Sequence, residues 1–79
     1  MDFIETKNFI ESKLQYGDKR TVAQKSRVKI GVVNNMLKCT DINKMTAVQK
    51  ECWINMVNLI MDREERLNKS LKRIEEAIK

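Results

Sequence analysis

The sequence predicts an all-α fold, and its composition gives the first reason. None of its 79 residues is Pro and only two are Gly, so the residues that most often interrupt helices are scarce. The chain is instead rich in Lys, Glu, Asn, Ile and Met, and its apolar residues recur at helical spacing. A chain of this length has room for one small domain.

The first helix is expected at residues 3–16. Asp2 is a good N-cap, and Glu5 follows three residues later, as in a capping box. Gly17 is placed to end this helix in the left-handed conformation. One face of the helix is apolar and comprises Phe3, Ile10 and Leu14, with Phe9 beside them.

Two short helices should follow, at about 18–25 and 29–38, with a break between them at residues 26–28. Asp18 is predicted to be the N-cap of the first. The apolar positions that would meet the core are Val22 and Ala23 in the first helix, and Val33, Met36 and Leu37 in the second, while Ile30 and Val32 fit this stripe less well.

A polar connection is expected at residues 39–45, where Asp41 could cap a brief turn. Thr46 and Gln49 then form a second capping box. Since no helix breaker follows, the last helix could cover residues 47–79, which would be about 50 Å long at about 1.5 Å per residue.

Several classes of function are excluded by residue types that the sequence lacks. Without His there is no Ser-His or Cys-His pair, and no glycine-rich phosphate loop occurs. The paired acids Glu64–Glu65 and Glu75–Glu76 are adjacent on a helix and point apart. Cys39 and Cys52 form no C-x-x-C motif, so we expect two buried, reduced thiols. We therefore expect no enzyme, no metal and no cofactor.

The distribution of apolar and charged residues bears on the cellular compartment. No apolar run approaches the roughly 18 residues that a membrane span needs. Charges at Asp2, Glu5 and Lys7 interrupt any signal-peptide core. We expect a cytoplasmic protein with no membrane partner and no small-molecule substrate.

Positive charge is concentrated in one part of the chain. The formal net charge of +5 divides into −2 for residues 1–12, +6 for residues 13–38 and +1 for residues 39–79. A concentrated basic surface attracts polyanions, of which nucleic acid is the most abundant in a cytoplasm. A solvated basic surface without a partner is the alternative.

Residues 19–38 carry a pattern of small and apolar positions. Ala23 is small at the fifth position and Ser26 at the eighth, and the apolar positions are Val22, Val28, Val33 and Met36, followed by Leu37. This pattern resembles the helix-turn-helix of the lac repressor and Cro families, which are DNA-binding transcription regulators. The resemblance implies a small repressor-like bundle followed by a long C-terminal helix.

Two positions depart from the family pattern. Arg27 stands where Gly is usual, because the turn there is left-handed, and this would cost about 1–2 kcal/mol. Lys29 stands where Ser or Thr usually caps the next helix, at a cost of about 1 kcal/mol.

The resemblance also implies how DNA would be bound. The second helix of the motif enters the major groove. Its residues that would face bases are Lys29, Ile30, Gly31, Asn34 and Asn35. The residues that would face phosphates are Lys19, Arg20, Thr21, Lys25, Arg27 and Lys38. For each of them, ordinary surface exposure is the alternative.

The last helix has apolar residues at heptad spacing. Trp53, Ile60, Leu67 and Ile74 form one row, and Val57, Glu64, Leu71 and Ile78 form the second. We place the DNA-binding domain at 1–61 and a dimerisation segment at 62–79. There, Leu67, Leu71, Ile74 and Ile78, here called the apolar seam, would be buried by a second copy. Folding back on the domain, or fraying, are the alternatives.

The sequence thus predicts a small homodimeric regulator that binds double-stranded DNA sequence-specifically, as a repressor or a phage- or plasmid-type control protein. Half-sites about one helical turn, ~34 Å, apart would suit such a dimer. The alternative is a protein–protein interaction module of the same shape without DNA binding, which would present an apolar second helix. Ile30 and Val32 leave that alternative open.

Overall fold

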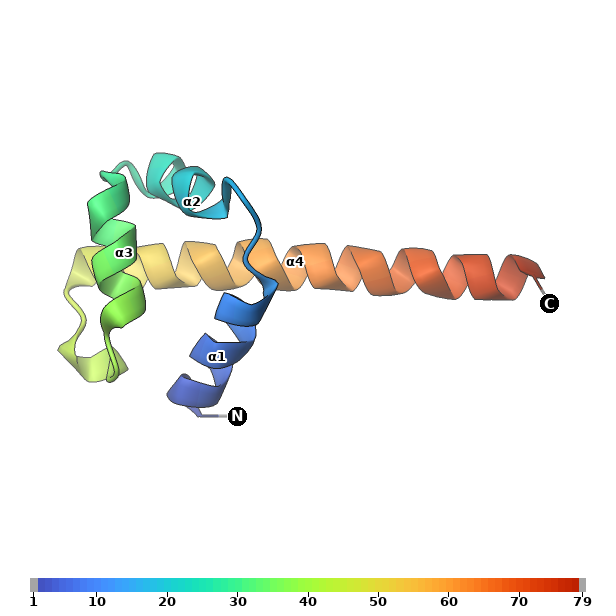
Figure 1. The fold of residues 1–79 in the computed structure, drawn as a ribbon, viewed down its shortest axis with the longest axis horizontal. Coiled ribbons are helices and arrows are strands. Elements are labelled where there is room, and N and C mark those ends of the chain that lie inside the picture. Colours follow the sequence, from blue (N-terminus) through green and yellow to red (C-terminus); the bar gives the residue numbers. More distant parts are fainter. Residues whose placement is uncertain (1, 79) are drawn as a thin grey trace.

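A computed structural model describes residues 2–78, and its regular structure in this range is entirely helical. The elements, in chain order, are α1 (Phe3–Lys13), α2 (Asp18–Ser26), α3 (Ile30–Lys38), the short 3₁₀ helix η1 (Ile42–Lys44) and α4 (Ala47–Ile78). Helices α1, α2 and α3 gather around the N-terminal half of α4, and the C-terminal half of α4 extends alone (Figure 1). The all-α fold with a long last helix, predicted from the sequence, is confirmed.

The core lies between α4 and the three shorter helices. Each of the four α-helices contributes fully buried side chains, which are Ile10, Val22, Val33, Met36, Cys52, Met56 and Ile60. Phe3 of α1 lies edge-on against Trp53 of α4, with 5.2 Å between the ring centroids. The apolar positions predicted for α2 and α3 therefore face the core, with Val28 half-buried beside it.

The connection between α1 and α2 differs from the prediction. Helix α1 ends at Lys13, not near Tyr16, and Gly17 (φ 89°) is the N-cap of α2. Asp18 is not an N-cap, because its carboxylate is buried and turned back toward the connection, where it accepts a hydrogen bond from the Gln15 N–H at 2.7 Å. The left-handed glycine thus shapes the start of α2 instead of the end of α1.

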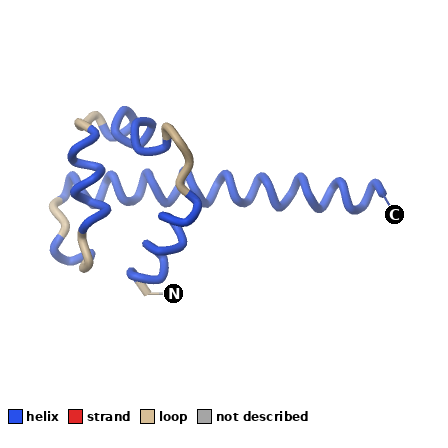
Figure 2. Tube along the Cα trace, in the orientation of Figure 1, coloured by secondary structure: helices blue, strands red, loops and turns tan. Residues whose placement is uncertain are grey.

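The turn between α2 and α3 has the left-handed residue that the sequence pattern predicts. Arg27 has φ 58° and ψ 43°, and it is the one non-glycine residue of the described chain with positive φ. The N–H groups of Arg27 and Val28 donate to carbonyls near the end of α2, at 3.2 and 3.0 Å. Lys29 is extended and its side chain makes no cap, as expected. The turn separates α2 and α3 into two helices of different direction (Figure 2).

The segment before α4 contributes a residue to the core, although its sequence is mostly polar. Met45 is 5% exposed and belongs to the core, whereas the sequence assigned it to a polar connection. Asp41 caps η1 through the Asn43 N–H, and Thr46 and Gln49 bond each other's N–H groups in a capping box, both as predicted. Both cysteines are free thiols, but Cys39 is only half-buried, because it lies at the C-terminus of α3.

Helix α4 is the scaffold of the molecule. It runs for 32 residues, and the predicted continuation to Lys79 lies outside the described residues. Trp53, Met56 and Ile60 are buried under the other helices. Residues 65–78 are all exposed, so the covered part of α4 ends near Glu64.

Replacing Arg27 with Gly should stabilise the protein by about 0.5–1 kcal/mol, because glycine removes the left-handed strain but loses more chain entropy on folding. Arg27→Ala is the matched control, since alanine removes the same charge and keeps the strain. Urea denaturation of the three proteins would measure the difference. Equal stability of the Gly and Ala variants would contradict the argument.

Candidate nucleic-acid interface

Helix α3 has one buried and one exposed face. Val33, Met36 and Leu37 lie in the core. The opposite face carries the residues that the sequence predicted to read bases, of which Lys29, Ile30, Gly31 and Asn35 are exposed and Asn34 is half-buried. The helix is therefore held from one side and presents two amides, a lysine and an isoleucine on the other.

The N-terminus of α2 lies beside this exposed face. Lys19, Arg20 and Ile30 line one surface hollow, together with the connection from Leu14 to Gly17. Lys19, Asn34 and Lys38 line a neighbouring hollow, whose other residues are Glu11, Leu14 and Leu37. Lys19 borders both hollows, so the structure brings three predicted phosphate-contacting residues next to two predicted base-contacting residues.

The other predicted phosphate contacts are exposed but are arranged differently. Lys25 and Arg27 lie at and just beyond the C-terminal end of α2, away from Lys19 and Arg20. The Thr21 hydroxyl donates to the Gly17 carbonyl at 3.0 Å, so only its lone pairs remain free for another donor. Thr21 is therefore poorly suited to donate to a phosphate.

Backbone groups add to the positive character at the start of α2. The Asp18 N–H donates to the Gln15 carbonyl and the Thr21 N–H donates to Gly17. By helix geometry, the N–H groups of Lys19 and Arg20 have no acceptor within the helix. Such groups favour a bound anion.

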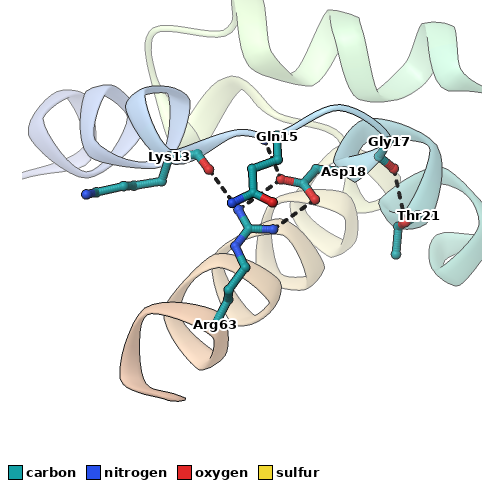
Figure 3. A network of polar contacts seen from close by, with 6 residues as sticks. All are labelled: Lys13, Gln15, Gly17, Asp18, Thr21 and Arg63. Atoms are coloured by element: carbon teal, nitrogen blue, oxygen red, sulfur yellow. Dashed lines mark hydrogen bonds and ion pairs between the residues drawn. The ribbon is translucent and has the colours of Figure 1, made fainter. Parts of the chain in front are cut away.

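A carboxylate at the first helical position would oppose an anion, but Asp18 is neutralised internally. Both of its oxygens accept hydrogen bonds from the two terminal nitrogens of Arg63, each at 3.0 Å (Figure 3). Arg63 also donates to the Lys13 carbonyl at 2.7 Å. This group of contacts, here called the Asp18–Arg63 clamp, joins the end of α1 and the start of α2 to α4.

The clamp changes the acidity of both partners. Burial raises the pKa of Asp18, but the hydrogen bonds from Arg63 and Gln15 and the charge of Arg63 outweigh burial, so the pKa lies below its ordinary value. The hydrogen bond to Asp18 raises the pKa of Arg63 against the opposing effect of burial. Asp18 is therefore ionised and paired at neutral pH.

Sequence reasoning missed this clamp, although one signal was present. Asp18 is the single acidic residue between positions 13 and 38, which marks it as a residue with a specific basic partner. A second missed contact joins the C-terminal end of α2 to α4, where the Asn55 amide donates to the Ser26 hydroxyl at 2.8 Å. Together these two contacts hold both ends of α2 on α4.

Negative charge is present at the edge of the surface. Glu11 lines the hollow between α1 and α3, and its carboxylate lies 3.9 Å from the Lys7 ammonium. Lys13 pairs with Glu64 at 3.8 Å. The acidic residues near the hollows are thus accompanied by basic partners.

Comparisons with protein-family models, curated proteins and solved structures find no match for this chain. Residues 2–78 contain no group of three or more His, Cys, Asp and Glu side chains placed to hold a metal ion. Over the same residues, every helix is too short or too polar to pass through a lipid bilayer.

Replacing Arg63 with Met should destabilise the fold by about 2–3 kcal/mol, because a buried carboxylate then loses its charged partner. Arg66→Met is the matched control, since Arg66 lies three residues further along α4 and is exposed. Urea denaturation would measure both variants. A loss no larger than that of the control would show that the clamp does not stabilise the fold.

The clamp also predicts a pH dependence. Because the folded pKa of Asp18 is lowered, its stabilisation is fully present above the unfolded pKa of about 3.9 and is lost as the pH falls through the folded value. The Asp18→Asn variant should be less stable than the original protein at pH 7. The difference should shrink below about pH 4. Denaturation curves that stay equally far apart from pH 7 to pH 2 would contradict this.

Proposed function

We propose that this protein binds double-stranded DNA sequence-specifically through α3, as a homodimeric transcription regulator of the helix-turn-helix type. The observation that supports this most is the arrangement of the α2–α3 pair. The polar face of α3 is exposed, and at its edge Ile30 shares a hollow with Lys19 and Arg20 of α2, while Asn34 shares another with Lys19. Basic charge and exposed amides on one surface are what groove recognition requires.

Three exposed residues at or before the first turns of α3 have side chains that can recognise bases. The Asn35 amide can form two hydrogen bonds with adenine in the major groove, and Lys29 can bond guanine. Ile30 is 47% exposed and can contact a thymine methyl group. Gly31 has nothing within 4 Å of its missing side chain, so it leaves room for the approach of DNA. Asn34, which is half-buried, would reach only the edge of the groove.

Lys19, Arg20 and Lys38 would contact phosphates on the side of α3 that carries Ile30 and Asn34. Lys25 and Arg27 would extend the contact along the DNA backbone. Each phosphate contact releases condensed counterions, so affinity should fall steeply with salt. Such a protein would act by occupying its site in the cytoplasm, as a repressor or a small phage- or plasmid-type control protein does.

One observation favours a different function. The exposed side chain of Ile30 lines a hollow with Leu14 and Tyr16, and a protein partner could bury it. A protein–protein interaction module would need no basic rim and would tolerate high salt. The concentration of basic residues around α3 supports DNA over this alternative.

The direct test is selection of bound sequences from a random duplex pool at two salt concentrations. We expect an enriched half-site of a few base pairs and a marked loss of binding at the higher concentration. No enrichment, together with no retention of duplex DNA at low salt, would exclude the proposal.

Replacing Asn35 with Ala should reduce discrimination at one base pair by about 1–3 kcal/mol, because the bidentate contact with adenine is lost. Lys19→Ala is the comparison, since loss of a phosphate contact should weaken all sequences alike and lower the salt slope by about one. Competition binding with single-base variants of the selected site would measure both. Equal weakening of every sequence by Asn35→Ala would show that Asn35 does not read a base.

A further inference from the structure

The apolar seam is exposed along the free part of α4. Leu67, Leu71, Ile74 and Ile78 are 49%, 58%, 54% and 79% exposed. At about 100° of rotation per residue, they all point within about 40° of the direction of Ile60, which is fully buried. The seam therefore continues the same face of α4 that α1, α2 and α3 cover further back, and Figure 1 shows no other element beside it.

We propose that a second copy of the chain covers this seam in antiparallel orientation. Leu67 then packs against the partner's Ile78, and Leu71 packs against the partner's Ile74. The spacing of the four residues is four, three and four, which reads the same in both directions, so an antiparallel pair forms four apolar layers without a gap. This arrangement rests on the homodimer of the proposed function.

The position of α1 opposes a parallel pair. Packed helices lie about 8–10 Å apart, so a parallel partner would run along the whole covered face of α4. That face is occupied, since Arg63 bonds the Lys13 carbonyl at 2.7 Å and Glu64 lies 3.8 Å from the Lys13 ammonium. In an antiparallel pair, Ile78 of the partner subunit lies level with Leu67, just past α1, and the partner's own domain lies at the far end.

Charge also favours the antiparallel pair. In a parallel pair, Glu64 of the two copies would face each other in the same layer. In the antiparallel pair they are about 25 Å apart along the axis. Asn68 then lies beside the partner's Glu75, whose carboxylate can accept from the amide, and Ser70 lies beside the partner's Ala77. No like charges meet along either side of the seam.

The arrangement sets the separation of the two α3 helices. The Cys39 sulfur, just after α3, lies 4.0 Å from the Gln49 side-chain oxygen, and Ser26, which ends α2 shortly before α3, bonds Asn55. The two ends of the segment that contains α3 therefore lie beside residues 49 and 55 of α4. The centre of the antiparallel pair lies between residues 72 and 73, which places the two α3 helices about 60 Å apart. This is closer to two turns of DNA, about 68 Å, than to the one turn expected from the sequence.

A pair of charge variants tests the orientation. Asn68→Lys should tighten the dimer about 2- to 10-fold, because each added lysine faces the partner's Glu75, and Asn68→Glu should weaken it by a similar factor. In a parallel pair, residue 68 would face the partner's Arg63, whose charge is already paired with Asp18, so neither variant should change the dimer constant in this way. Within one chain, Glu64 and Lys72 each lie four residues from residue 68. Either charge at residue 68 is attracted to one of them and repelled by the other, so the effects within the single chain largely cancel.

Sedimentation equilibrium of the full chain without DNA gives the dimer constant and keeps this test independent of DNA binding. No change, or changes of opposite sign, would overturn the antiparallel arrangement. A monomeric mass for the original protein would overturn the second copy as the occupant of the seam.

Two further results bear on the interface. Replacing Leu67 and Leu71 together with Lys should give monomers that keep their fold by circular dichroism, since both residues are exposed in the single chain. An unchanged dimer would show that the seam is not the interface. Selected DNA sites with half-sites one turn apart would contradict the antiparallel arrangement and leave DNA binding intact.

Discussion

The structure depends on one continuous apolar stripe along α4. Trp53, Met56 and Ile60 carry its buried part, and three helices too short to be stable alone find their hydrophobic partner there. The stripe does not stop where the domain stops, because Leu67 and Leu71 continue it into solvent. The same helix therefore builds the core against which α3 packs, and it carries an apolar surface that no other described part of the chain covers.

The clamp between Asp18 and Arg63 explains how the start of α2 stays basic although its first residue is an aspartate. Its geometry requires a carboxylate at the first position of α2, next to Lys19 and Arg20. An unpaired carboxylate there would weaken the attraction for an anion at this helix end. Because Arg63 comes from α4, the pair is neutral, and it adds a structural bond without subtracting positive charge from the surface.

Sequence patterns predicted several features that depend on local chemistry, but they misplaced the end of α1 and the roles of Gly17 and Asp18, because the bond of Asp18 to α4 reshapes that connection. The left-handed turn at Arg27 and the capping box of Thr46 and Gln49 were found where the sequence placed them, because they involve residues a few positions apart. The buried position of Met45 and the bond between Asp18 and Arg63 were missed, since the partners are far apart in the chain. The exposed face of α3 was also predicted, but its closeness to Lys19 required the fold.

The stiffness of α4 links the two proposals. A single nine-residue helix such as α3 offers few contacts with DNA, so one copy alone would bind weakly. Joining two copies raises affinity only when the connection allows both to bind at once. An unbroken helix from Ala47 to Ile78 has a fixed length. The spacing of the two DNA half-sites must therefore match the distance between the two α3 helices. The spacing of the half-sites is then set by the number of residues between the core and the centre of the seam. On these two proposals, inserting or deleting turns of α4 would change the half-site spacing that the dimer selects.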